Sequence, residues 1–177
     1  TTHFPDGEAV LWWYLLEDLI LRESRIEFEF DGREYQYFCA SVWEKEQTYQ
    51  DIHELILNGP LGTLNQRIQQ IFKNYDVDLL KKTSDLALSW QQIREMSKDP
   101  LVEIGAHTIH HYPLNKLSES AVQKEMEGSR DKIESETGQK IEHFCYPFGT
   151  KNEVGEREFQ IAKKCGFKTS TTTHAAN

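Results

Sequence analysis

The chain is long enough for one domain and carries an excess of acidic side chains. Its 177 residues include 20 Lys and Arg against 29 Asp and Glu, a formal net charge of −9. Such a length suits a domain with a sizeable core. The negative charge argues against a nucleic acid or an anionic membrane as partner. No apolar run approaches the length of a membrane span, and no secretory leader is recognisable.

The first forty residues predict a buried helix followed by a β-hairpin. The helix, at about residues 11–20, is apolar on more than one face, and Asp6 is expected to cap it. Asp31-Gly32 is typical of a two-residue type I′ turn. Folding residues 25–41 about this turn pairs Phe28 with Tyr35, and the alternation of apolar and polar side chains specifies that register.

Residues 43–87 predict helices, one of them behind a Thr63…Gln66 capping box. We interpret residues 22–87 as a hairpin and helical insertion within a single domain that spans residues 1–177.

From Ser89 onward, predicted helices alternate with short apolar strands. Helices are expected to begin at Ser89, at Ser118 or Ser120, and at residue 153, with strands over residues 101–106, 141–146 and 167–173. This alternation predicts the α/β class, with a parallel sheet that is either open or closed as a barrel.

Polar side chains stand where the predicted strands end. The strands lead into His107, into Tyr146-Pro147-Phe148-Gly149 and into Thr173-His174. Because the carboxyl ends of parallel strands share one rim, where the chemistry of such folds collects, these residues are expected to lie together.

His107 and His111 have a spacing that lets two imidazoles converge on one ion if the segment makes a helical turn, which the Thr108 hydroxyl could fix. Neutral imidazole suits Zn²⁺. The alternative is a polar loop with solvated histidines, but the position at a strand end favours a metal site. His110 is expected to point elsewhere.

Two stretches resemble motifs of the NodB-homology polysaccharide deacetylases, carbohydrate esterase family 4, and a third resembles one of the family's strands. Residues 103–111, EIGAHTIHH, followed by Pro113-Leu114 and Leu117-Ser118, resemble the family's second motif, H-[ST]-x-x-H. Residues 144–149, FCYPFG, resemble its third motif, and residues 165–169, CGFKT, resemble the strand that follows. The resemblance covers residues 89–177 well and extends weakly toward the N-terminus.

The resemblance implies a distorted (β/α) barrel and metal-dependent removal of acetyl groups from an N- or O-acetylated carbohydrate, polymer or glycolipid. Zn²⁺, or another divalent metal, would be held by His107, His111 and an aspartate, and would activate a water and the acetyl carbonyl. The backbone N–H of Phe148 would stabilise the oxyanion. Tyr146 and Pro147 would contact the substrate.

The sequence departs from the family pattern at three points. The first motif, Thr-Phe-Asp-Asp-Gly, which supplies the aspartate and the general base, has no counterpart. Cys145 replaces the arginine of the third motif. The histidine that serves as general acid has no matching motif, although His174 stands at a strand end and could reach the site.

We therefore expect an internal portion of a larger deacetylase that binds zinc weakly, is catalytically inactive and self-associates through uncovered barrel edges. By resemblance it would act in bacterial cell-envelope metabolism, in the cytoplasm or periplasm. Two alternatives remain open: a deacetylase-like domain that binds carbohydrate without chemistry, and an unrelated metal-binding module.

Overall fold

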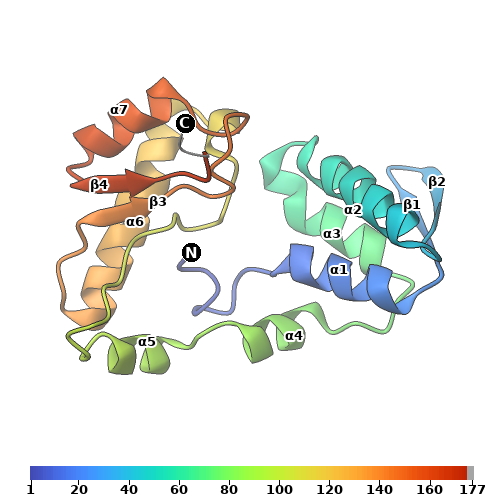
Figure 1. Cartoon of the computed structure of the whole chain (residues 1–177), viewed down its shortest axis with the longest axis horizontal. Helices are drawn as coiled ribbons and strands as arrows, with labels where there is room; N and C mark the ends of the chain where they lie inside the picture. Colours follow the sequence, from blue (N-terminus) through green and yellow to red (C-terminus); the bar gives the residue numbers. More distant parts are fainter. Residues whose placement is uncertain (175–177) are drawn as a thin grey trace. The chain divides into compact units, whose positions relative to one another are not determined.

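The computed structural model describes residues 1–174 and mixes helices with strands (Figure 1). The chain divides into two compact units. The first joins residues 1–9 to the chain from Ala87 onward, and the second is Val10–Leu86. The insertion predicted over residues 22–87 thus lies almost wholly in the second unit, which also includes the first helix. None of the described helices has the length and apolar character needed to cross a membrane.

The second unit consists of five helical segments and one hairpin. In chain order these are α1 (Trp12–Arg22), β1 (Arg25–Phe30), β2 (Arg33–Phe38), α2 (Val42–Leu57), η1 (Leu61–Thr63), α3 (Leu64–Phe72) and α4 (Leu79–Leu86).

The hairpin has the predicted register. Phe28 pairs with Tyr35 and Glu29 with Glu34, around a turn in which Asp31 and Gly32 both have positive φ. The Phe28 and Tyr35 rings stack with centroids 5.5 Å apart. Alternate β1 side chains are buried, as one covered face requires.

Two predicted helix caps are wrong, because both side chains have other partners. Leu11 occupies the N-cap of α1 without a side-chain hydrogen bond, whereas Asp6 accepts a hydrogen bond from Trp90 Nε1 at 2.7 Å. Thr63 precedes α3 but donates its hydroxyl hydrogen to the Pro60 carbonyl at 3.0 Å.

The first unit contains α5 (Trp90–Met96), η2 (Leu114–Lys116), α6 (Glu119–Thr137), β3 (His143–Cys145), α7 (Glu156–Lys164) and β4 (Thr169–Thr171). The predicted starts of α5 and α6 are confirmed, whereas α7 begins at Glu156, after its N-cap Gly155, and not at residue 153 as predicted. Ser89 and Ser118 cap α5 and α6 with their hydroxyls, and Gly138 ends α6 in the left-handed conformation.

The strands of this unit are parallel, as expected, but shorter than predicted. β3 pairs with β4, and Ala106 makes an isolated parallel bridge to Phe144. The strand expected over residues 101–106 is reduced to that bridge because Asp99 turns the chain there. Its carbonyl accepts from Val102 N at 3.0 Å and its carboxylate accepts from Leu101 N at 2.9 Å. The described strands form part of a parallel sheet, and barrel closure stays a prediction.

Helices α6 and α7 lie beside β3 and β4 (Figure 1) and enclose one apolar core. Val122 and Met126 of α6 are fully buried, and Ile161 of α7 and Phe144 of β3 are nearly so. This packing covers one face of the sheet and fixes the positions of the strand ends.

Candidate active site

Backbone hydrogen bonds bring the predicted strand ends to a common rim. Cys145 N donates to the Ala106 carbonyl at 2.9 Å, and Tyr146 N donates to the Thr171 carbonyl at 3.1 Å. The segments that follow these three strand ends therefore leave the sheet side by side, as the sequence predicted.

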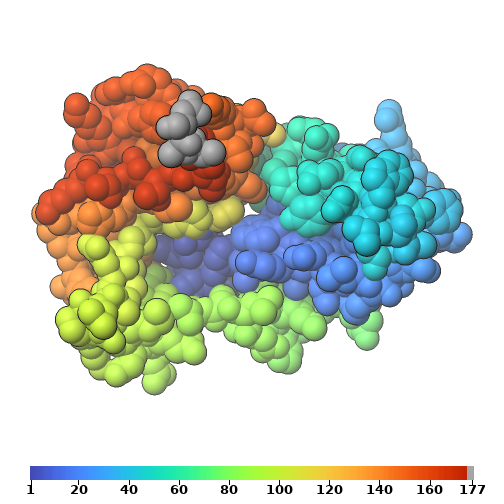
Figure 2. All heavy atoms as spheres, viewed as in Figure 1, coloured from blue at the N-terminus to red at the C-terminus, as the bar shows by residue number. Residues whose placement is uncertain are grey.

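The first residues of the chain lie on the other side of His107. Thr2 N donates to the Thr108 carbonyl and His3 N to the Ile109 carbonyl, each at 3.2 Å, while the Thr1 hydroxyl donates to the His107 carbonyl at 2.9 Å. Figure 2 shows these dark blue residues set back beside the yellow segment that contains His107. Residues 107–111, which we call the histidine loop, are thus held along both edges.

The two predicted metal ligands converge, but not through a helical turn. The His107 and His111 ring centroids are 4.9 Å apart at an interplanar angle of 70°. Thr108 and His111 instead adopt left-handed backbone angles, with φ of 63° and 62°. The Thr108 hydroxyl holds the segment, as predicted, but not in a helical turn: it is buried and accepts a hydrogen bond from His111 N at 3.1 Å.

The environment keeps both imidazoles neutral and orients one of them. His107 Nδ1 lies 2.7 Å from the Cys145 carbonyl, which can only accept, so Nδ1 carries the hydrogen and Nε2 keeps its lone pair. Burial lowers the pKa of His107 to about 4, and burial together with the neighbouring His107 lowers the pKa of His111 to about 3. Neutral imidazoles are the form that binds a metal ion.

Glu125 of α6 supports the histidine loop, and sequence reasoning missed it. Its carboxylate accepts hydrogen bonds from Ile109 N at 2.9 Å, from His110 N at 3.0 Å and from His110 Nδ1 at 2.5 Å. Burial alone would raise the Glu125 pKa, but the bonds from His110 and Ile109 lower it overall. The missed signal is a charged residue at an inward position of α6, next to Met126.

The turn after β3 borders His111. Phe148 has φ of 60°, and its ring centroid lies 5.0 Å from that of His111. Gly149 has φ of 68°, and a Cβ added there would lie 2.9 Å from Thr173 N. Only glycine fits that position, so the sharp turn expected of the Pro-Phe-Gly sequence is present.

Of the remaining predicted site residues, Tyr146 and Pro147 are buried and His174 is half-buried. Tyr146 is 1% exposed, and its hydroxyl makes a hydrogen bond to Ser170 Oγ at 3.1 Å. His174 follows Thr173, whose hydroxyl donates to the Phe148 carbonyl at 3.0 Å, and its Nε2 is buried without a hydrogen bond among the described residues.

Strained backbone concentrates at this rim. The non-glycine residues with positive φ in the described chain are Asp31, in the hairpin turn, and Thr108, His111 and Phe148. Such angles are costly outside turns and persist where surrounding contacts enforce them, as at binding and catalytic sites. Within residues 1–174, no group of three or more His, Cys, Asp or Glu is arranged to hold a metal ion. The candidate metal site therefore consists of the two histidines.

A hollow of about 340 Å³ opens beside His107 on the uncovered face of the sheet. Glu103, His143, Cys145 and Thr171 also line it. His143 is on this strand face as predicted, where its ring contacts Glu103 and Thr169.

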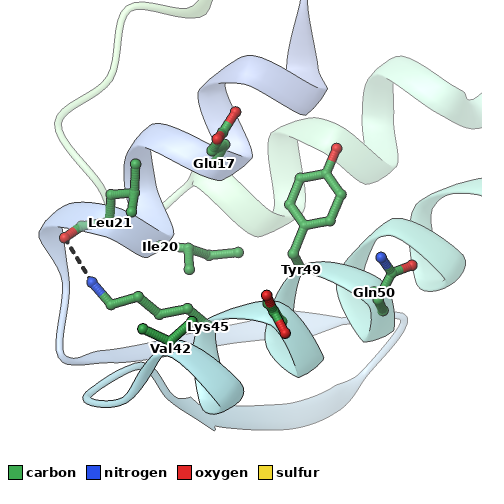
Figure 3. A pocket seen from close by; sticks show the side chains of 8 residues that line it. Glu17, Ile20, Leu21, Val42, Lys45, Tyr49 and Gln50 are labelled. Carbon is green, nitrogen blue, oxygen red and sulfur yellow. Dashed lines mark hydrogen bonds between the residues drawn. The ribbon is translucent and has the colours of Figure 1, made fainter.

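The other unit has a separate groove between α1 and α2, with a volume of about 370 Å³ (Figure 3). Ile20, Leu21, Val42 and Tyr49 give it an apolar lining, and Lys45 closes one end by donating to the Leu21 carbonyl at 3.1 Å. None of the side chains predicted to act in catalysis or metal binding lines this groove, so the rim of the first unit remains the candidate active site.

Comparison with known proteins adds independent findings. The sequence model of the family described as polysaccharide deacetylase matches residues 59–170. No curated protein matches. Among solved structures, the Streptococcus pyogenes deacetylase PplD in complex with acetate is 19% identical, with 96% of this chain and 72% of that chain covered and a TM-score of 0.46. BC0361, a polysaccharide deacetylase from Bacillus cereus, is 25% identical, with 63% and 37% covered and a TM-score of 0.46.

Proposed function

Because the chain belongs to the polysaccharide deacetylase family, we propose that it serves the metal-dependent removal of acetyl groups from a carbohydrate, with zinc held by His107 and His111. The convergence of two neutral imidazoles on the rim is the observation that carries this proposal.

The donor chemistry fits zinc. His107 presents Nε2 as a lone-pair donor because Nδ1 is engaged by the Cys145 carbonyl, and such a carbonyl partner is typical of zinc-binding histidines. Zinc takes four ligands, so two histidines leave positions for a carboxylate, water or substrate. A bound zinc ion would supply Lewis-acid activation of the acetyl carbonyl and of water. With two ligands, we expect the chain alone to bind zinc weakly and to be inactive.

The turn after β3 supplies the second element of the proposal. The Phe148 N–H would donate to the acyl oxygen as negative charge develops there, and the left-handed angle of Phe148 would aim it. Gly149 and Thr173 hold this turn through the bond from Thr173 N to the Gly149 carbonyl at 3.0 Å. Fixed backbone donors of this kind stabilise charge without reorganising.

Three further residues have proposed roles. Pro147 shapes the substrate side of the turn, and Tyr146 supports it from the core through Ser170. His174 is the candidate to protonate the leaving group, which requires its buried Nε2 to turn toward the rim. The partner is a carbohydrate, and self-association through uncovered sheet edges stays a prediction.

Zinc titration of the chain and its variants tests the proposal. His107→Ala and His111→Ala should each weaken zinc binding by at least about tenfold, since each removes one of two protein ligands. His53→Ala, on α2 in the other unit, is the control and should bind like the wild type. Unchanged zinc affinity in both folded rim variants would contradict the proposed site.

A further inference from the structure

Building on the proposed zinc site, we propose that Glu125 is a positioning residue that holds the histidine loop in the conformation in which His107 and His111 converge. Glu125 accepts hydrogen bonds from the backbone between the two imidazoles.

The contacts of Glu125 fall on the middle of the loop. Its Oε2 accepts from the N–H groups of both Ile109 and His110, and its Oε1 accepts from His110 Nδ1. Glu125 is 6% exposed, so water competes little for these bonds. Hydrogen bonds to an ionised carboxylate are about twice as strong as neutral ones.

The two clamped residues lie between the two left-handed ones. Thr108 and His111 have positive φ, and Ile109 and His110 connect them. Non-glycine residues leave the left-handed region readily. Contacts on Ile109 and His110 therefore fix the path of the chain between the two left-handed residues, and Glu125 supplies such contacts. The clamp turns the His110 ring toward α6, which separates it from the converging pair.

Helix α6 is suited to carry such a clamp. It spans Glu119–Thr137 and has defined caps at both ends. Val122 and Met126 anchor the same face in the core. Gly128 leaves room for the Ile109 side chain, since a Cβ there would lie 2.6 Å from Ile109 Cδ1. Glu125 therefore attaches the histidine loop to a rigid helix.

Amide hydrogen exchange of the chain, read by NMR at Ile109 and His110, tests the clamp without metal. Glu125→Ala should accelerate exchange at both amides by at least about tenfold, because both lose their acceptor. Glu125→Gln should retain most of the protection. Its amide oxygen can accept from both N–H groups, while its NH₂ can donate to His110 Nδ1 in the other tautomer.

Zinc affinity is the second readout. Loss of a residue that orients metal ligands typically weakens binding about 10- to 100-fold, which we expect for Glu125→Ala, with rescue by Glu125→Gln. Glu127→Ala is the matched control on the same helix. Its carboxylate accepts from Gln123 Nε2 at the surface, so both readouts should stay at wild-type values.

Unchanged exchange at Ile109 and His110 in folded Glu125→Ala would overturn the positioning role. If Glu125→Ala does not fold, Glu125→Asp decides: the carboxylate withdrawn by one methylene should release both amides, and retained protection would overturn the role. A wild type that binds no zinc, with exchange still accelerated by Glu125→Ala, would remove the proposed function and leave the clamp in place. The opposite result is a wild type that binds zinc and a Glu125→Ala variant with unchanged zinc affinity and unchanged exchange. It would overturn the clamp and leave the proposed function in place.

Discussion

The β1–β2 hairpin and the histidine loop show two ways of fixing a backbone. In the hairpin, each strand pairs with the other across a two-residue turn, and its one strained non-glycine residue, Asp31, lies in that turn. In the histidine loop, the partners are distant in sequence: Thr2, Glu125 and Cys145. The hairpin is specified by its own residues, whereas the loop depends on three other segments as well as on its own bond between His111 N and the Thr108 hydroxyl.

The largest expected effect on stability comes from a substitution in the hairpin. Phe28 is fully buried at the centre of β1, so Phe28→Ala should lower the free energy of unfolding by about 3–5 kcal/mol through lost burial and a cavity. Urea unfolding followed by circular dichroism measures the loss. Phe38→Ala is the matched control: Phe38 ends β2 and is 57% exposed, so its loss should cost less than about 1 kcal/mol. Equal losses would mean that burial of this face does not stabilise the hairpin.

This difference also explains what the sequence could predict. The hairpin register followed from the Asp31-Gly32 turn and from alternation, which are local features. The caps at Ser89 and Ser118 were predictable for the same reason, since each bonds to a backbone N–H three residues later. His107 and His111 were identified from their spacing and their position at a strand end.

The geometry around those histidines was beyond local reasoning. The left-handed conformations of Thr108 and His111 depend on neighbours that only folding brings together. Asp6 had the chemistry of a helix cap, but its hydrogen bond to Trp90, 84 residues away, gave it another role. Glu125 was visible only as a charge on an inward helix face, a pattern that indicates a buried partner without naming it.

An intermediate effect on stability is expected from a substitution in the histidine loop. Thr108→Val keeps the shape of a fully buried side chain but removes the acceptor for His111 N. The unsatisfied N–H should cost about 1–3 kcal/mol of stability and weaken zinc binding, because His111 is no longer held. Urea unfolding and zinc titration measure the two effects. Thr63→Val, which loses one local surface bond, should change stability by less than about 0.5 kcal/mol. A Thr108→Val protein of wild-type stability would show that other contacts fix the loop.

The smallest effect returns to the hairpin, where one local feature opposes the fold. Glu29 and Glu34 face each other on the exposed side of the ladder, and like charges at such a pair are unfavourable. Glu29→Lys should therefore stabilise the hairpin by about 0.2–1 kcal/mol, an amount that high salt should diminish. The double variant Glu29→Lys with Glu34→Lys is the control, because it restores repulsion at the pair while it lowers the net negative charge further. If the double variant is more stable than the single one, the gain comes from the net charge of the chain. If it falls back to the wild-type value, the cross-strand pair alone is responsible, and the hairpin is governed by its own residues down to its weakest contact.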